Sequence, residues 1–139
     1  MAQHNVAAEL AKVPIFSACS KRELAAIGHV AKGVSHKAGT VIAKEGDRGI
    51  GLFLILEGTC DVTIGGKRIA RLGPGEFFGE IALLDRGPRT ATVTAKTDVE
   101  LAGITEWVFR GLLTEHPSIA VKTLESVAGR LRAVSREPV

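Results

Sequence analysis

The sequence has little cysteine, few aromatic residues and no long apolar run. Its 139 residues include two cysteines, one tryptophan and no tyrosine. Cys19 and Cys60 belong to no paired-cysteine motif and have no histidine cluster nearby, which disfavours a zinc site or a disulfide framework and suits a reducing compartment. No stretch approaches the ~20 apolar residues that span a bilayer, and the N-terminus lacks the apolar core of a signal peptide. The sequence therefore predicts a cytoplasmic protein without a membrane segment.

A strong charge of one sign is also missing. The 18 lysines and arginines nearly balance the 15 acidic residues, and the formal net charge is +3. Nucleic-acid-binding domains usually concentrate basic residues on one face, whereas these are scattered, so no direct nucleic-acid binding is expected. The histidines do not cluster either, and no metal site is expected. They are His4, His29, His36 and His116.

Glycine, by contrast, is abundant at 16 residues. Between residues 33 and 105, short runs rich in valine, isoleucine, phenylalanine and threonine alternate with glycine turns, and Gly65-Gly66 is typical of a hairpin. The runs are Val34–His36, Thr40–Ala43, Leu52–Leu56, Cys60–Ile64, Lys67–Leu72, Thr90–Ala95 and Val99–Thr105. Many short strands at this spacing predict an antiparallel, jelly-roll-like β-roll of about eight strands.

Helical patterns flank the roll on both sides. Residues 5–31 carry apolar residues at helical spacing, with a capping box in which Ser20 is followed by Glu23. We therefore predict a single α+β domain over residues 1–139. Its parts are N-terminal helices at 1–32, the roll at 33–105 and two C-terminal helices at 106–136.

The C-terminal region predicts two helices separated by a break. Thr105 is a suitable cap for a helix that ends near Glu115, and Pro117 suits the first turn of the next helix. Trp107, near the start of the first of these helices, is expected to pack on the roll. The last helix carries one apolar seam, which is able to lie on the roll, on a partner helix or on a ligand. The seam consists of Ala120, Leu124, Val127, Leu131 and Val134.

Residues 77–93 break the strand pattern. Within them, Glu80–Leu84 has helical propensity, and a single helical turn facing into a roll exposes backbone N–H groups that attract an anion. Gly79 allows a ligand to approach the backbone closely, and Arg89 offers a planar set of donors suited to phosphate. The Glu80 carboxylate is able to accept hydrogen bonds from a sugar hydroxyl. The pattern predicts a short phosphate-binding helix inside the roll.

This segment resembles the phosphate-binding cassette of the cyclic nucleotide-binding domain family. The match runs from Phe78 to Leu83 (Phe-Gly-Glu-Ile-Ala-Leu) and from Pro88 to Val93 (Pro-Arg-Thr-Ala-Thr-Val). The resemblance implies a regulatory domain that binds cAMP or cGMP and performs no chemistry on it. It extends over nearly the whole chain, through Val13–Phe16, Gly39–Asp47 and Leu52–Gly58.

The resemblance also implies a role for each cassette residue. Glu80 would bind the ribose 2′-hydroxyl, and Arg89 would pair with the single negative charge of the cyclic phosphate. The backbone N–H groups of Ile81 and Ala82 would donate to the same phosphate. Gly79 would lie against the ribose.

Thr90 leaves the choice of nucleotide open. In the resembling family a threonine at this position is often associated with cGMP, because its hydroxyl reaches both phosphate and guanine, but it also serves cAMP sites in bacterial members. The short loops of this chain resemble those bacterial members. We therefore expect cAMP, with cGMP as the alternative.

The base-binding residues are predicted from the strands of the roll. Val62, Ile69 and Leu72 are candidates to pack on the purine, although such residues equally often fill the core of a roll. Phe77 and Phe78 are expected to belong to that core rather than to contact the ligand.

In the resembling family, a residue of the last helix usually covers the base. The candidates here are Arg130, Arg132 and Val134, because an arginine stacks on a purine face and the helix has no aromatic residue. The two arginines are explained equally well as solvated helix residues. Movement of this helix over the bound base would carry the signal.

The predicted function is that of a cyclic nucleotide sensor that needs no cofactor or metal. An enzyme on a similar scaffold, such as a cupin, requires a His/Glu metal cluster that the sequence lacks. A degenerate domain that serves only for docking or dimerisation is the alternative, and the pair of Glu80 and Arg89 argues against it. The sequence shows no effector domain, so the chain is expected to be either a standalone sensor or a regulatory domain of a longer protein, acting on an effector domain or partner protein outside this chain. A homodimer through the C-terminal helix is a further expectation.

Overall fold

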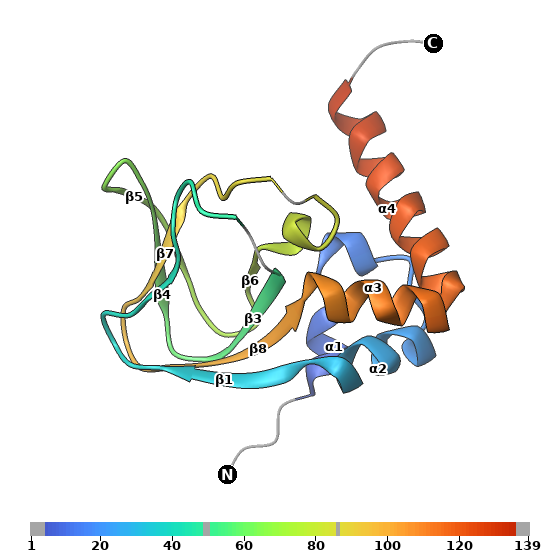
Figure 1. Cartoon of the computed structure of the whole chain (residues 1–139), viewed down its shortest axis with the longest axis horizontal. Coiled ribbons are helices and arrows are strands. Elements are labelled where there is room, and N and C mark those ends of the chain that lie inside the picture. The colour runs from blue at the N-terminus through green and yellow to red at the C-terminus, as the bar shows by residue number, and fades with distance from the viewer. Residues whose placement is uncertain (1–4, 49–50, 86, 136–139) are drawn as a thin grey trace.

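The computed structural model describes residues 5–48, 51–85 and 87–135, and it shows a β-roll with helices gathered at one end (Figure 1). This confirms the predicted α+β architecture, although the first strand begins at Lys32, within the predicted helical part. The ends of the predicted domain, 1–4 and 136–139, lie outside the described residues. The helices are α1 (Val6–Leu10), the 3₁₀ helix η1 (Pro14–Phe16), α2 (Lys21–Val30), α3 (Glu106–Glu115) and α4 (Pro117–Ser135).

Within the described residues, eight antiparallel strands form the two walls of the roll. They are β1 (Lys32–His36), β2 (Val41–Ala43), β3 (Gly51–Glu57), β4 (Cys60–Ile64), β5 (Lys67–Leu72), β6 (Phe77–Phe78), β7 (Thr92–Ala95) and β8 (Val99–Thr105). One sheet has the order β1-β8-β3-β6 and the other the order β2-β7-β4-β5. The sequence pattern predicted β4, β5 and β8 at their observed bounds.

The cassette region departs from the strand pattern in two ways. β6 is a two-residue strand that pairs Phe78 with Phe53 of β3, and it is too short for a periodicity to reveal. β7 begins at Thr92, later than the sequence predicts, because the chain before it pairs elsewhere. The Arg89 N–H donates to the Asp47 carbonyl at 2.7 Å, which holds this segment against the connection that follows β2.

Two hydrophobic clusters form the core. The first joins the helices to the end of the roll, where the ring centroids of Phe16 and Phe109 lie 5.7 Å apart. The second fills the roll itself, where Phe53 stacks on Phe78 at 5.3 Å. The expectation that Trp107 packs on the roll is wrong. Its side chain is 63% exposed, because the first turns of α3 direct Phe109 inward instead.

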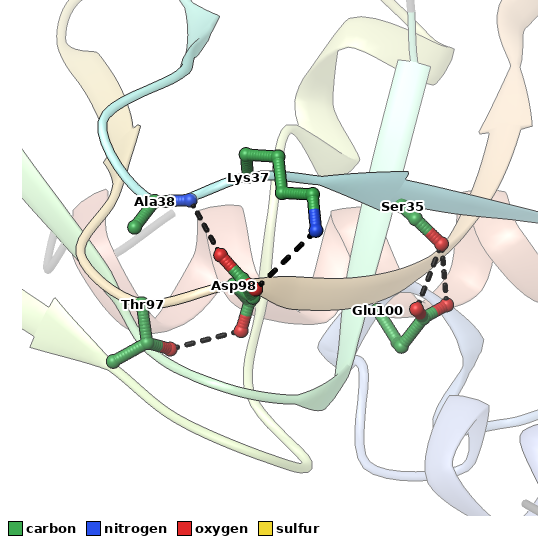
Figure 2. Close-up of polar contacts among 6 residues, drawn as sticks. All are labelled: Ser35, Lys37, Ala38, Thr97, Asp98 and Glu100. Carbon is green, nitrogen blue, oxygen red and sulfur yellow. Dashed lines mark hydrogen bonds and ion pairs between the residues drawn. The ribbon is translucent and has the colours of Figure 1, made fainter.

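At the end of the roll away from α3, polar side chains tie the β1–β2 turn to the β7–β8 turn (Figure 2). The Asp98 carboxylate accepts a hydrogen bond from the Ala38 N–H at 2.9 Å and lies 3.7 Å from Lys37 Nζ. Nearby, the Ser35 hydroxyl donates to the Glu100 carboxylate at 2.7 Å. Because both side chains of the Lys37–Asp98 pair are exposed, this ion pair is expected to contribute at most ~1 kcal/mol to stability.

The last helix, α4, packs at its base and then projects from the body (Figure 1). Ile119 and Thr123 are buried and form the packing face. Most of the predicted seam lies elsewhere: Leu124, Leu131 and Val134 are all exposed. The reason is that the helix is rotated so that its Ile119 face, rather than the seam, meets the N-terminal helices.

Polar contacts around Glu23 hold the base of α4. The Glu23 carboxylate accepts a hydrogen bond from the Ser20 N–H at 2.8 Å, which completes the predicted capping box. Lys122 Nζ lies 3.5 Å from the same carboxylate and donates to the Ala18 carbonyl at 3.3 Å. The hydrogen bond from Ser118, followed by that from the Ser20 amide, lowers the pKa of Glu23 to about 2. These contacts attach α4 to residues that precede the roll.

Glu23→Gln is predicted to destabilise the protein by about 1–3 kcal/mol at neutral pH, because hydrogen bonds to a charged group are lost. The pKa of the folded state lies below the ordinary value of 4.5. The ionised carboxylate therefore stabilises the fold above pH ~4.5, and this contribution is lost as the pH falls towards 2. Urea unfolding between pH 7 and pH 3 measures the effect.

The difference in unfolding free energy between wild type and Glu23→Gln should shrink with acid. Glu9→Gln is the control, because Glu9 on α1 forms an ion pair with the exposed Lys12, which follows that helix. A Glu23→Gln difference that stays constant over this pH range would contradict the assigned role of Glu23.

Candidate functional site

The site begins where β6 ends, at Gly79. Its φ of 84° lies in the left-handed region, where a residue with a side chain is strained. A Cβ there would collide with the Gly51 carbonyl oxygen and would lie 2.8 Å from Nη1 of Arg89. Glycine at this position therefore lets the chain turn with the Arg89 guanidinium directly beside it.

The predicted short helix follows as a single 3₁₀ turn, η2 (Glu80–Leu83). Leu83 anchors it, because its side chain is buried in the cluster shared with the helices. Ala82 is half-buried, and Ile81 is exposed toward the cavity described below. The Ala82 N–H donates to the Gly79 carbonyl at 3.0 Å, so a phosphate bond from Ala82 would have to share this donor.

Arg89 approaches the same point from the segment before β7. Its backbone is held on both sides, because its N–H donates to the Asp47 carbonyl at 2.7 Å and its carbonyl accepts from the Gly46 N–H at 2.8 Å. The side chain donates through Nη2 to the Gly51 carbonyl at 3.2 Å. Burial lowers the pKa of the guanidinium, which still stays protonated at neutral pH. No carboxylate of the described residues pairs with it, so its positive charge is available to an anion.

Gly79, η2 and Arg89 line a cavity of about 500 Å³, a size typical of small-molecule sites. The lining combines a half-buried cation with carboxylates and apolar side chains, which suits a ligand with an anionic part and an apolar part. The lining residues are Val62, Phe77, Phe78, Gly79, Glu80, Ile81, Ala82, Asp85, Gly87, Pro88, Arg89, Thr90, Ala91 and Val93.

The structure brings all the predicted cassette residues together in this cavity. They are Gly79, Glu80, Ile81, Ala82, Arg89 and Thr90. Their separate roles toward a ligand stay predictions. What the structure adds is that Glu80 and Arg89, from segments on either side of a turn, line one hollow.

Of the three residues predicted to pack on the purine, one lines the cavity and two do not. Val62 lines the cavity. Ile69 does not, because it falls in a bulge between β4 and β5 and its side chain is 56% exposed. Leu72 packs against the cluster inside the roll and is absent from the lining. For this residue the core role left open by the sequence is the one observed.

The lid candidates do not reach the cavity in this structure. Arg130, Arg132 and Val134 are exposed on the part of α4 that projects from the body (Figure 1). None of them is among the lining residues. A lid role therefore requires α4 to move toward the roll.

Sequence reasoning missed several lining residues. Phe77 and Phe78, expected only in the core, also line the cavity. Val93 pairs with Val62 across β7 and β4, and the register of two strands far apart in sequence is not readable from either one. Asp85 follows η2 in an Asp-x-Gly pattern, a turn signal that could have placed it at the rim.

Within residues 5–48, 51–85 and 87–135, no group of three or more His, Cys, Asp or Glu side chains is placed to bind a metal ion. His4 lies outside these ranges. Among the described helices, none combines the length and the hydropathy that a membrane span requires.

Comparison with known proteins identifies the family to which this geometry belongs. The profile of the cyclic nucleotide-binding domain matches residues 34–116, which include the whole cavity. The chain belongs to the cyclic nucleotide-binding domain family. In this cyclic nucleotide-binding domain, the match covers nearly all of the roll and α3, whereas the N-terminal helices and α4 lie outside it.

Two curated relatives illustrate the match. The domain is 36% identical over 111 residues to the cyclic nucleotide-gated potassium channel mll3241 of Mesorhizobium japonicum, covering 80% of this chain and 31% of the channel. It is also 36% identical over 106 residues to the cAMP-dependent protein kinase regulatory subunit of Aspergillus niger, covering 75% of this chain and 26% of that subunit. The chain thus spans less than a third of each of these relatives.

A solved structure extends the likeness to the terminal helices. The N-terminal domain of a transcriptional regulator from Streptomyces coelicolor superposes with a TM-score of 0.86 at 31% identity. The superposition covers 94% of this chain and 97% of that domain. Roll and helices therefore recur together as one arrangement.

Proposed function

We propose that this cyclic nucleotide-binding domain is a sensor that binds cAMP between η2 and Arg89 and signals through α4. The observation that carries the proposal is the Arg89 guanidinium, which is half-buried, pairs with no carboxylate of the described residues and lies beside Gly79. A cyclic phosphate is a diester with one negative charge, so a single arginine neutralises it. The planar guanidinium also matches two phosphate oxygens.

The other lining residues fit the rest of the nucleotide. The Glu80 carboxylate would accept a hydrogen bond from the ribose 2′-hydroxyl, and the Ile81 N–H would donate to the phosphate. Val62 and Val93, paired across β4 and β7, would form an apolar wall against the purine. Binding of this kind needs no cofactor or metal and performs no chemistry on the nucleotide.

cAMP is the nucleotide we favour. Thr90 lines the cavity, and its hydroxyl is able to serve the phosphate that both nucleotides share. The relative from Aspergillus niger is named as a cAMP-dependent regulatory subunit, which supports the same choice. If Thr90 instead reads guanine, cGMP is the ligand.

The signal would leave through α4. Its base is fixed to the N-terminal helices around Glu23 and Lys122, whereas residues 128–134 are exposed. They include Gly129, which weakens the helix by ~1 kcal/mol relative to alanine. We propose that this distal part folds over the purine, with Arg130, Arg132 or Val134 as the lid. The movement would act on an effector domain or a partner protein, in the cytoplasm.

Calorimetry with cAMP and cGMP tests the choice of ligand. We expect a dissociation constant for cAMP that is micromolar or tighter, about −8 kcal/mol, and weaker binding of cGMP. Adenosine, which lacks the phosphate, is the control and should bind far more weakly. Tighter binding of cGMP would reverse the assignment of the base. A domain that binds neither nucleotide at millimolar concentration would be a docking or dimerisation module instead.

Hydrogen exchange with and without cAMP tests the movement of α4. Protection should rise in residues 79–92, because the ligand contacts them, and also in residues 125–135, because the distal helix closes over the base. Protection confined to residues 79–92 would show that α4 is a fixed wall and that the signal leaves by another route.

A further inference from the structure

The segment that holds Arg89 is attached to the start of α3 at two points. The first runs from the Arg89 side chain through the backbone of Gly51. Arg89 Nη2 donates to the Gly51 carbonyl at 3.2 Å. Gly51 pairs with Thr105, the residue before α3, across β3 and β8. A Cβ on Gly51 would overlap the Ile104 carbonyl oxygen, so the two strands approach each other here more closely than side chains would allow.

The second attachment is made by the side chain of Arg48. Arg48 and Pro88 form an isolated antiparallel bridge, directly beside the two backbone hydrogen bonds that hold Arg89. From this short ladder the Arg48 side chain extends to α3, where its Nη2 lies 3.5 Å from Oε1 of Glu106. One ion pair therefore connects the Arg89 segment to the first residue of α3.

Glu106 is well placed to receive this contact. It is the first residue of α3, where the helix dipole favours a negative charge. Its side chain is only 10% exposed, and its second carboxylate oxygen lies 3.5 Å from Nε of Arg110 on the next turn. A carboxylate this buried is held in place by its partners, whereas the Arg48 side chain is 60% exposed and is free to adopt other rotamers in water.

We propose that Arg48 is a positioning residue for Arg89, because its ion pair with Glu106 fixes the Arg89 segment to the first turn of α3. Phosphate binding to Arg89 would then change the position of α3. A displacement of α3 would in turn change the position of Arg89, because coupling between two sites is reciprocal. The identity of the ligand rests on the proposed function. The attachment itself is a property of the domain without ligand.

The attachment is tested first without nucleotide, by amide exchange in Arg48→Ala. Exchange at Gly46 and Arg89 should accelerate about two- to fivefold, the loss expected for an exposed ion pair. Arg48→Lys should restore most of the protection, because lysine keeps the charge. The turn at the other end of the roll is the internal reference. There the Gly39 and Ala95 amides, bonded at 2.7 and 2.8 Å, should exchange at wild-type rates in both Arg48 variants.

Two further variants distinguish loss of the Arg48–Glu106 ion pair from loss of any surface charge. Lys37→Ala breaks the surface ion pair with Asp98, at the end of the roll away from α3 (Figure 2), and should leave exchange at Arg89 unchanged. Glu106→Gln should reproduce the effect of Arg48→Ala. The double variant should accelerate exchange at Gly46 and Arg89 no more than Glu106→Gln alone, because both substitutions remove the Arg48–Glu106 pair and the Arg110 contact of Glu106 lies within α3.

Calorimetry with cAMP then measures the consequence for binding. The affinity of Arg48→Ala should fall about two- to fivefold at low salt, and less at 1 M salt, where the ion pair is screened. Unchanged exchange at Gly46 and Arg89, or fully additive losses with Glu106→Gln, would overturn the inference. If the wild type binds no nucleotide, the proposed function fails, while the exchange measurement still decides the attachment.

Discussion

The Arg89 guanidinium donates to the Gly51 carbonyl at 3.2 Å, and the backbone on both sides is arranged around that contact. The chain turns at Gly79 beside this hydrogen bond, where a Cβ would collide with the Gly51 carbonyl oxygen and the Arg89 guanidinium. Gly51 itself lies against the Ile104 carbonyl. The Arg89 cation is partly buried and pairs with no carboxylate among the residues that the structure describes, so holding it there costs solvation energy. The fold meets this cost by fixing the Arg89 backbone to the residues after β2. The outcome is a cavity that holds a positive charge ready for an anion.

In the proposed function, the helices report that this cavity is occupied. α3 begins next to the Arg89 segment, and α4 is anchored around Glu23 and Lys122 before it leaves the body (Figure 1). The base of α4 packs on the N-terminal helices, whereas residues 128–134 are exposed, and the proposed movement concerns this exposed part. A ligand shifts such an element only through contacts that differ between its two positions.

The sequence predicted what local chemistry determines and missed what depends on register. Glycine turns and short apolar runs located most strands, and the cassette motif located Gly79, Glu80 and Arg89 in one cavity. Ile69 lies outside the cavity lining because of a bulge in β5, which cannot be read from alternation. Val93 was missed because it meets Val62 only through strand pairing. The packing face of α4 is likewise set by tertiary contacts rather than by the apolar seam.

Thermal unfolding of Arg89→Met, with and without cAMP, tests the central claim that the charge of Arg89 makes this cavity a nucleotide site. Wild type should gain about 2.7 kcal/mol at a hundredfold excess of cAMP over its dissociation constant. Without ligand, Arg89→Met should unfold near the wild-type temperature, because removal of a partly buried charge offsets the loss of the hydrogen bond to the Gly51 carbonyl. At the same cAMP concentration its gain should fall to about 0.9 kcal/mol or less, since ~2–5 kcal/mol of binding is lost. An Arg89→Met protein that cAMP stabilises as much as wild type would contradict the account.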